Sequence, residues 1–307
     1  MAKNLVLKPK DMGGRQLFVV DVSAVMRSNF ISSKNPYRGR YGRRVLTWDV
    51  DGKKFNTTAL YGLLRLFTMY SFDVDYVFAF DTPKNYRKQD NPDYKSNRKK
   101  MDREYFDQVD VARFMLEDVG FTTHSVEGYE ADDFVVETVN RYKDVYDHIF
   151  VVTNDFDLAQ LIDDNVYIKN VIQKNGDITR DNYEARLGCP YNSILLYRAM
   201  VGDKADNISG IYRFGPKSFY RFLEDEGIYG ELQDLRKRRG EYEILNTAVT
   251  LNEDQRAAAL ASLKLIVPRL PKGYSNFDIR SNIDKDMFEF YLSRYGMNSV
   301  VKALRES

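Results

Sequence analysis

Five short apolar stretches in the first part of the chain have the pattern of buried β-strands, because β-branched and aromatic residues dominate them. They cover residues 16–25, 75–80, 121–126, 148–153 and 165–170, and the first is expected to end near Asp21. In residues 131–145, apolar positions instead recur at helical spacing. Strands that alternate with helical stretches predict an α/β fold with an open, mostly parallel sheet flanked by helices.

After about residue 190 the strand patterns stop, and the remaining sequence has a mainly helical pattern. We therefore expect an α/β core over residues 1–190 and a helical region over residues 191–307. No apolar run reaches transmembrane length, and the N-terminus lacks a secretory signal pattern. These features predict a cytoplasmic protein without a membrane partner, and we expect a monomer.

Acidic residues follow the ends of the predicted strands. Asp21 ends the first strand, and Asp81 directly follows the second. Ligands of open parallel sheets bind beyond the carboxyl ends of the strands. More acids occur where the predicted helix begins, in "GYEADDFVVET" (128–138), and in "GDKADN" (202–207). The acids that we expect to converge are Asp21, Asp81, Glu130, Asp132, Asp133, Asp155, Asp157, Asp203 and Asp206.

The start of the predicted helix leaves two arrangements open. If Glu130 is helical, it shares one face with Asp133 and Glu137, and Asp132 points elsewhere. If Glu130 instead caps the helix, Glu130 and Asp132 can converge. Each of these acids alone also has an ordinary explanation, as a turn residue or as a complement to the helix dipole.

Gathered at one edge of a sheet, these acids would repel one another and take up protons unless cations neutralised them. One cysteine and two histidines cannot build a usual zinc site, so any metal is held by oxygen. Oxygen ligands favour Mg²⁺, Mn²⁺ or Ca²⁺, and the crowded acids predict one such ion or two. Two hard cations favour phosphodiester hydrolysis, because they activate water and stabilise the leaving oxygen.

Basic residues are concentrated in three runs, although the net charge is only +1. Residues 27–44 contain six basic and no acidic residues, residues 84–103 contain eight basic and three acidic ones, and residues 236–239 read "RKRR". Separate basic and acidic surfaces indicate a polyanionic partner, whereas scattered solvated surfaces are the alternative. Tyr86 and Tyr94 lie within the second run, a mixture that suits single-stranded nucleic acid.

In their order and spacing, these motifs resemble the flap endonuclease and 5′-to-3′ exonuclease family. That family includes the 5′-nuclease domain of bacterial DNA polymerase I and a free-standing phage branch that contains phage RNase H. The matching pieces lie between residues 16 and 223 and are "VVDVS", "FAFD", "YKSNRK", "GYEADD", "TNDFD", and "GDKADN" followed by "GIYRFGPKS".

The resemblance implies a catalytic site of two ions. The first would be surrounded by Asp21, Asp81, Glu130 and Asp132. The second would be held, in part through water, by Asp133, Asp155, Asp157, Asp203 and Asp206. Lys95 and Arg98 would reach the scissile phosphate from an arch, residues 84–105, through which a 5′ single strand passes. The residues with catalytic roles would be Lys95, Arg98, Asp21, Asp81, Glu130, Asp132 and Asp155.

The resemblance also implies a helix–three-turn–helix over about residues 207–223 that grips duplex backbone, with Lys217 as its basic residue and a potassium ion nearby. Arg213 stands where the family usually has a further glycine. A left-handed backbone is costly for arginine, so we expect a reshaped turn, which argues against potassium, with Arg213 on a phosphate. The expected nucleic-acid contacts are Lys84, Arg87, Tyr94, Lys95, Arg98, Gly210, Arg213, Gly215 and Lys217.

The function that the resemblance implies is a Mg²⁺-dependent, structure-specific 5′ nuclease. It would remove RNA primers and 5′ flaps in phage DNA replication and act on branched DNA and RNA–DNA duplexes. A PIN-like ribonuclease is an alternative that shares acids at strand ends but needs no arch or hairpin. A non-catalytic junction-binding protein is a second alternative. Residues after 240 carry no motif for a partner such as a single-stranded-DNA-binding protein or another replisome component.

Overall fold

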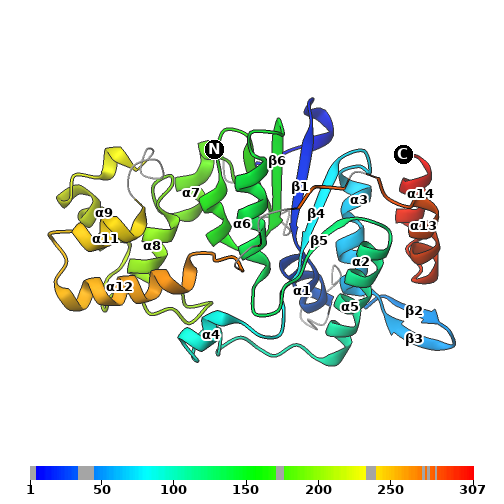
Figure 1. The fold of residues 1–307 in the computed structure, drawn as a ribbon, viewed down its shortest axis with the longest axis horizontal. Helices are drawn as coiled ribbons and strands as arrows, with labels where there is room; N and C mark the ends of the chain where they lie inside the picture. The colour runs from blue at the N-terminus through cyan, green and yellow to red at the C-terminus, as the bar shows by residue number, and fades with distance from the viewer. Residues whose placement is uncertain are drawn as a thin grey trace.

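The computed structural model describes residues 5–33, 45–170, 176–232, 240–271, 274, 277–280 and 282–307. Figure 1 shows a central sheet that lies between two groups of helices. The basic run 236–239 and most of the run 27–44 lie outside the described residues. Within the described part of the chain, no helix is long and apolar enough to cross a membrane.

The central sheet has five parallel strands in the order β5-β4-β1-β6-β7. In chain order these are β1 (Gln16–Asp21), β4 (Asp75–Ala79), β5 (Thr122–His124), β6 (His148–Thr153) and β7 (Val166–Asn170). All six residues of β1 are buried, because β1 is the middle strand and both of its faces are covered. The predicted open parallel sheet is confirmed, although β5 is shorter than the apolar stretch 121–126.

Alternate residues of β1 pack into two separate hydrophobic layers, as the two-residue repeat of a strand requires. Leu17 and Val19 face one layer, whereas Phe18 and Val20 face the other. The first layer is covered by α6 (Ala131–Tyr142), α7 (Tyr183–Leu187), α8 (Ile194–Val201), α9 (Pro216–Asp225), α11 (Glu241–Thr247) and α12 (Glu253–Ile266). The second is covered by α1 (Val22–Ser33), α2 (Thr58–Leu64), α3 (Leu66–Met69), α5 (Arg103–Asp118), α13 (Lys285–Arg294) and α14 (Asn298–Arg305).

The last two helices do not extend the helical group formed by α8, α9, α11 and α12. Instead α13 and α14 return to the far side of the sheet (Figure 1). Phe288 on α13 makes edge contacts with Phe67 and Phe121, at centroid distances of 5.4 Å and 5.6 Å. The region predicted over residues 191–307 is therefore not one packed unit, because its C-terminal part completes the core.

Shorter elements connect this framework. A two-stranded antiparallel hairpin, β2 (Thr47–Val50) and β3 (Lys53–Asn56), turns at Asp51 and Gly52, whose φ angles are 53° and 78°. An Asp-Gly pair is a strong hairpin signal, so the sequence could have predicted it. The remaining short helices are η1 (Pro9–Asp11), α4 (Tyr86–Asp90), η2 (Phe156–Leu161), η4 (Arg180–Asn182) and η5 (Tyr229–Glu231).

Candidate active site

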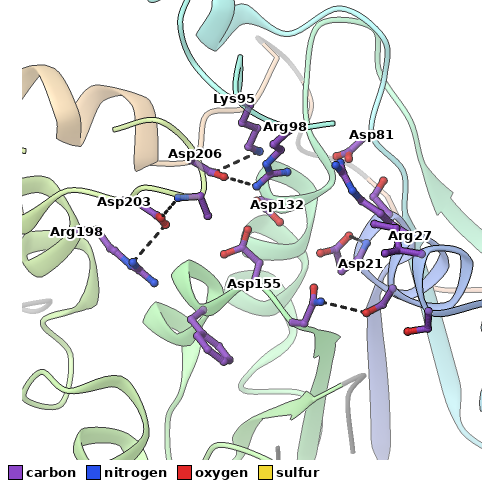
Figure 2. A pocket seen from close by; sticks show the side chains of 18 residues that line it. Asp21, Arg27, Asp81, Lys95, Arg98, Asp132, Asp155, Arg198, Asp203 and Asp206 are labelled. Atoms are coloured by element: carbon purple, nitrogen blue, oxygen red, sulfur yellow. Dashed lines mark hydrogen bonds and ion pairs between the residues drawn. The ribbon is translucent and has the colours of Figure 1, made fainter. Parts of the chain in front are cut away.

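A pocket of about 640 Å³ opens at the carboxyl end of the sheet. Figure 2 shows acidic side chains that enter it from β1, α6 and the loops after β4, β6 and α8. Six of the nine predicted acids line this pocket: Asp21, Asp81, Asp132, Asp155, Asp203 and Asp206. The sequence-based expectation that distant acids meet at one sheet edge therefore holds for these six.

Local hydrogen bonds fix three of these acids at the strand ends. Asp21 Oδ2 accepts from Thr153 Oγ1 at 2.8 Å, which ties the end of β1 to the end of β6. Asp81 Oδ1 accepts from the backbone N–H of Ala131 at 2.8 Å, so an acid in the loop after β4 satisfies one free donor at the start of α6. Asp155 caps η2, because its Oδ1 accepts from the N–H of Asp157 at 3.0 Å.

At the start of α6, the capping arrangement is the one that occurs. Glu130 has an extended backbone (φ −97°, ψ 160°), and its N–H donates to Asp133 Oδ2 at 3.0 Å. Asp132 therefore lines the pocket, whereas Asp133 is directed into the protein. Glu137 does not reach the site, since it pairs with Arg141 one turn later at 3.4 Å.

Three acids at the site, which we call the paired carboxylates, are neutralised by basic side chains: Glu130, Asp133 and Asp206. Glu130 accepts from Lys95 Nζ at 2.6 Å and from Arg87 Nη1 at 3.0 Å. Asp206 accepts from Arg98 Nη2 and lies 3.7 Å from Lys95 Nζ. Burial alone would raise the pKa of Glu130, but Lys95 and then Arg87 outweigh it and the pKa falls below its usual value.

Asp133 has the most complete set of partners. Arg87 donates to it twice, from Nη2 at 2.7 Å and from Nη1 at 3.1 Å. The same guanidinium donates from Nε to the carbonyl of Leu265 at 2.8 Å, which links α6 to the end of α12. The Arg269 N–H also donates to Asp133 at 2.9 Å. Asp133 thus holds the framework together and does not face the pocket.

Four acids, which we call the open carboxylates, have no ion pair with any basic residue in the described part of the chain: Asp21, Asp81, Asp132 and Asp155. Burial, followed by the charge of Asp81, raises the pKa of Asp21 to about 7. Burial, followed by Asp155 and Asp21, raises the pKa of Asp132 well above its usual value. Burial and Asp206 likewise raise the pKa of Asp155. Lys95 lowers the pKa of Asp132 and Asp155 only in part, so among the described residues the negative charge of these acids stays incompletely balanced.

The chemistry of this set fits a hard divalent cation. Its donors are carboxylate oxygens, the ligands that Mg²⁺ and Mn²⁺ prefer, and the raised pKa values reflect a charge that a cation would neutralise. As the side chains stand, no three His, Cys, Asp or Glu residues of the described chain are close enough together to hold an ion. The structure therefore presents the donors without a tight ligand cluster.

A family model described as 5′-3′ exonuclease, N-terminal resolvase-like domain, matches residues 16–188, more than half of the chain. This chain belongs to that family. It is accordingly an enzyme of the 5′-3′ exonuclease type. The matched segment contains β1 to β7 and the open carboxylates, so the family assignment and the pocket concern the same part of the molecule.

Two curated relatives illustrate the match. The DNA polymerase I of Caldicellulosiruptor bescii is 34% identical over 193 residues, which make up 59% of this chain but only 23% of the polymerase. The 5′-3′ exonuclease of Buchnera aphidicola subsp. Schizaphis graminum is 29% identical over 253 residues, 78% of this chain and 81% of that protein. The chain therefore spans less than a quarter of the polymerase and most of the free-standing exonuclease.

A solved structure shares the fold across nearly the whole chain. A flap endonuclease of bacteriophage T5, determined as a pseudo-enzyme-product complex with DNA and metal ions, has a TM-score of 0.56. The comparison covers 95% of this chain and 97% of that chain at 16% sequence identity. At this identity the likeness establishes the fold, including the helical region after residue 190.

Two predicted DNA contacts of this exonuclease are wrong as direct contacts, because folding buries them. Arg87 is only 2% exposed and is held by Glu130, Asp133 and the Leu265 carbonyl. Tyr94 is 3% exposed, and its hydroxyl donates to Glu130 Oε2 at 3.1 Å. Asp133 is likewise corrected from metal ligand to buried partner of Arg87. Arg87 and Tyr94 therefore hold the acids at the start of α6 in position and do not contact nucleic acid directly.

The segment 84–105, predicted as an arch, is described in full and is joined to the loop after α8. The Lys95 N–H donates to the Asp206 carbonyl at 2.9 Å, and Asn97 Nδ2 donates to the Lys204 carbonyl at 2.6 Å. These contacts place Lys95 and Arg98 on the pocket wall (Figure 2). Lys84, by contrast, is on the surface and pairs with Glu127 at 2.7 Å.

The range 207–223, predicted as a helix–three-turn–helix, contains only one helix, α9. The helix before it, α8, ends at Val201, and residues 202–215 join the two. Gly210 has φ 65°, and a Cβ there would lie 2.5 Å from the Gly202 nitrogen, so its role is close packing on α8 and not access for a phosphate. Gly215 is the N-cap of α9, and Lys217 is exposed in the first turn of that helix. Arg213 adopts φ 55°, so the expectation that arginine reshapes this turn is wrong.

Two basic residues that line the pocket were not predicted from the sequence as site residues. Arg27 reaches it from α1, where burial and the charge of Arg98 lower its pKa. Arg198 reaches it from α8, between Asp157 and Asp203. Arg27 belongs to a basic run and could have been singled out by its position in the helix after Asp21. No motif pointed to Arg198.

Proposed function

We propose that this chain is a Mg²⁺-dependent, structure-specific 5′ nuclease that cleaves phosphodiesters near junctions of single strands and duplexes. Its substrates would be flapped DNA and RNA–DNA duplexes. Its role would be to remove RNA primers and 5′ flaps during DNA replication, including phage replication. The observation that carries the proposal is that the open carboxylates and the cations Lys95 and Arg98 share one pocket. The T5 relative that was determined with DNA and metal ions supports it.

The open carboxylates would hold the first Mg²⁺ or Mn²⁺ ion, and Asp157, Asp203 and Asp206 would contribute to a second. Such ions supply an activated water and neutralise charge on the phosphate. Glu130 would act less as a ligand than as the anchor of Lys95, because both of its oxygens already accept from basic or hydroxyl donors. Its role would then be to position Lys95 over the pocket.

Lys95 and Arg98 would bind the scissile phosphate and stabilise the charge that develops on it. Their pKa values are raised, since burial, which alone would lower them, is outweighed by Glu130 for Lys95 and by Asp206 for Arg98. Both therefore stay protonated in the buried site. The Arg98 guanidinium is the more accessible, with 33% of its side chain exposed, and its planar fork suits phosphate oxygens.

The duplex would lie on the hairpin of α8 and α9. Residues 209–215 line a cavity of about 450 Å³ beside the start of α9. Backbone donors at a helix N-terminus favour an anion, and Lys217 adds an exposed positive charge. Arg213 would contact a second phosphate. Lys84 would bind the single-stranded arm, as an exposed cation at the beginning of the segment 84–105.

The central test is cleavage of a 5′-end-labelled flap duplex with Mg²⁺ and with EDTA. We expect junction-directed products only with Mg²⁺. Asp155→Asn should lower the cleavage rate by about a thousandfold or more while DNA binding is retained. Asp110→Asn, a change of the same kind at an exposed position on α5, should cleave normally. Full activity of Asp155→Asn, or binding by the wild type without any cleavage, would overturn the proposal.

The duplex contact has its own test. Lys217→Ala should weaken duplex binding and reduce the slope of log affinity against log salt by about one unit, because one phosphate contact is lost. Lys302→Ala, a matched change at an exposed lysine on α14, should leave the slope unchanged. An unaltered slope in Lys217→Ala would reject this contact.

A further inference from the structure

Arg198 faces two acids on the α8 side of the pocket. Its Nε lies 3.2 Å from Asp157 Oδ1, and its Nη1 lies 3.4 Å from Asp203 Oδ2. Figure 2 shows the contact with Asp203. One oxygen of each carboxylate therefore meets the same guanidinium. The other oxygen of Asp203 accepts from the Ala205 N–H at 2.7 Å, so the carboxylate is already oriented by its own loop.

The Arg198 contacts differ in kind from those of Arg87. Arg87 makes hydrogen bonds to Glu130, to Asp133 and to the Leu265 carbonyl, and its side chain is sealed from solvent. Arg198 Nε and Asp157 Oδ1 are both buried, yet neither has a hydrogen-bond partner, although they are only 3.2 Å apart. Charge alone holds this pair, and hydrogen-bond geometry does not lock it.

The pocket also gives the Arg198 side chain space to move away from Asp157 and Asp203. It lines the pocket of about 640 Å³, and 24% of its side chain is exposed. The open carboxylates across the pocket have no comparable cation among the described residues. A divalent ion can therefore approach the open carboxylates directly, whereas at Asp157 and Asp203 it meets a positive charge already in place.

We propose that Arg198 is a resident cation for Asp157 and Asp203, and that a divalent ion binds these two carboxylates only by displacing its guanidinium. The proposal rests on the proposed metal-dependent function and adds to it a residue that sets the affinity of the second ion. The two ions then bind with different strength. The open carboxylates bind the tighter one, and competition with Arg198 weakens the other.

The test counts bound Mn²⁺ by the magnetic resonance signal of the free ion, without nucleic acid and without reference to cleavage. The wild type should bind one ion tightly and a second more weakly. Arg198→Met removes the charge but keeps a long side chain, and it should strengthen the weaker site by at least about tenfold. The tighter site should change by less than about twofold.

Three further variants separate charge from packing. Arg198→Lys retains a cation and should keep the second site weak, whereas Arg198→Gln should behave like Arg198→Met. Arg198→Gln also provides the measurement if the methionine variant does not fold, which thermal unfolding will show. Arg221→Met, at an exposed arginine of α9, is the matched control and should bind Mn²⁺ as the wild type does.

The outcomes distinguish this proposal from the function on which it rests. If the wild type binds Mn²⁺ but Arg198→Met and Arg198→Gln leave the weaker site unchanged or weaken it, only the role of Arg198 is overturned. If the wild type binds no Mn²⁺ at all, the metal-dependent function and the role of Arg198 are overturned together.

Discussion

The paired and the open carboxylates meet at the carboxyl end of one sheet but have opposite effects on the fold. Asp133 and Asp132 are neighbours at the start of α6. Asp133 points inward to Arg87, and Asp132 points into the pocket, where burial and two other acids raise its pKa. One carboxylate stabilises the framework, and the adjacent one has no ion pair with any described basic residue. The residue type is the same in both cases. Whether a buried aspartate stabilises the fold or is available to a ligand therefore depends on whether a basic side chain pairs with it.

The paired carboxylates also explain how the open ones are kept close together. Arg87 links α4, α6 and the end of α12 through Glu130, Asp133 and the Leu265 carbonyl. Mutual repulsion would otherwise spread the acids at the pocket. The framework therefore opposes a repulsion that a bound cation would relieve.

The largest expected effect concerns a paired carboxylate. Asp133→Asn should lower the free energy of unfolding by about 3–5 kcal/mol, because it leaves the Arg87 guanidinium buried without its main counter-charge. Urea unfolding in EDTA measures this, with Asp110→Asn as the matched control. A loss below about 1 kcal/mol would show that Arg87 does not depend on Asp133.

Metal removal should act on the open carboxylates. A divalent ion that binds only the folded state stabilises it by about 2.7 kcal/mol at a hundredfold excess over its dissociation constant. We therefore expect Mg²⁺ to raise the midpoint of thermal unfolding of the wild type, and EDTA to reverse the rise. In Asp132→Asn the rise should be largely absent. An equal rise in both proteins would place the ion elsewhere.

The stability of the metal-free protein should depend on pH because the pKa of Asp21 is raised by folding. Its pKa is about 7 in the folded state, against an ordinary value of 3.8, so between these values the folded protein holds a proton that the unfolded chain has lost. Stability in EDTA should therefore fall as pH rises towards 7, by about 2 kcal/mol from about pH 5.5 onwards. Above pH 7 this contribution should level off.

The measurement needs Asp21→Asn as its reference, because His124 has the opposite effect. Burial lowers the pKa of His124 to about 4, so its contribution to stability improves as pH rises to its ordinary value. We expect the wild type to lose more stability than Asp21→Asn between pH 5.5 and 7 in EDTA. Identical pH profiles would contradict the raised pKa of Asp21.

The smallest expected effect lies outside both sets of carboxylates. Arg213 has φ 55°, a left-handed backbone that glycine adopts without strain. Arg213→Gly should raise the free energy of unfolding by up to about 1 kcal/mol and weaken duplex binding, since a phosphate contact is lost. Equal binding by both proteins would remove Arg213 from the proposed interface.

The sequence predicted the sheet and the meeting of six acids because both follow from local patterns. Buried parallel strands are continuous apolar runs, and parallel strands end at one edge. The partners of the acids were not predictable in this way. Arg87 reaches Glu130 across 43 positions and the Leu265 carbonyl across 178, and no spacing rule covers such distances.

For the run 84–103, composition gave a partly wrong prediction, again because contacts with distant residues decided which side chains are buried. Its lysines, arginines and tyrosines suggested a solvated nucleic-acid surface. In the fold, Arg87 is buried against Asp133 and the Leu265 carbonyl, and Tyr94 is buried against Glu130. Arg213 is a second example, in which the surrounding hairpin imposes a backbone conformation that local preference disfavours. In both places tertiary contacts overrode a local rule.

The most direct test of the contrast between the two sets is the stability of Asp132→Asn in EDTA. Removing an uncompensated buried charge should stabilise the metal-free protein by at least about 1 kcal/mol in urea unfolding at neutral pH. The same change at the neighbouring Asp133 should destabilise it. If Asp132→Asn is instead less stable than the wild type in EDTA, Asp132 has a stabilising role in the metal-free fold, and the division into open and paired carboxylates is wrong.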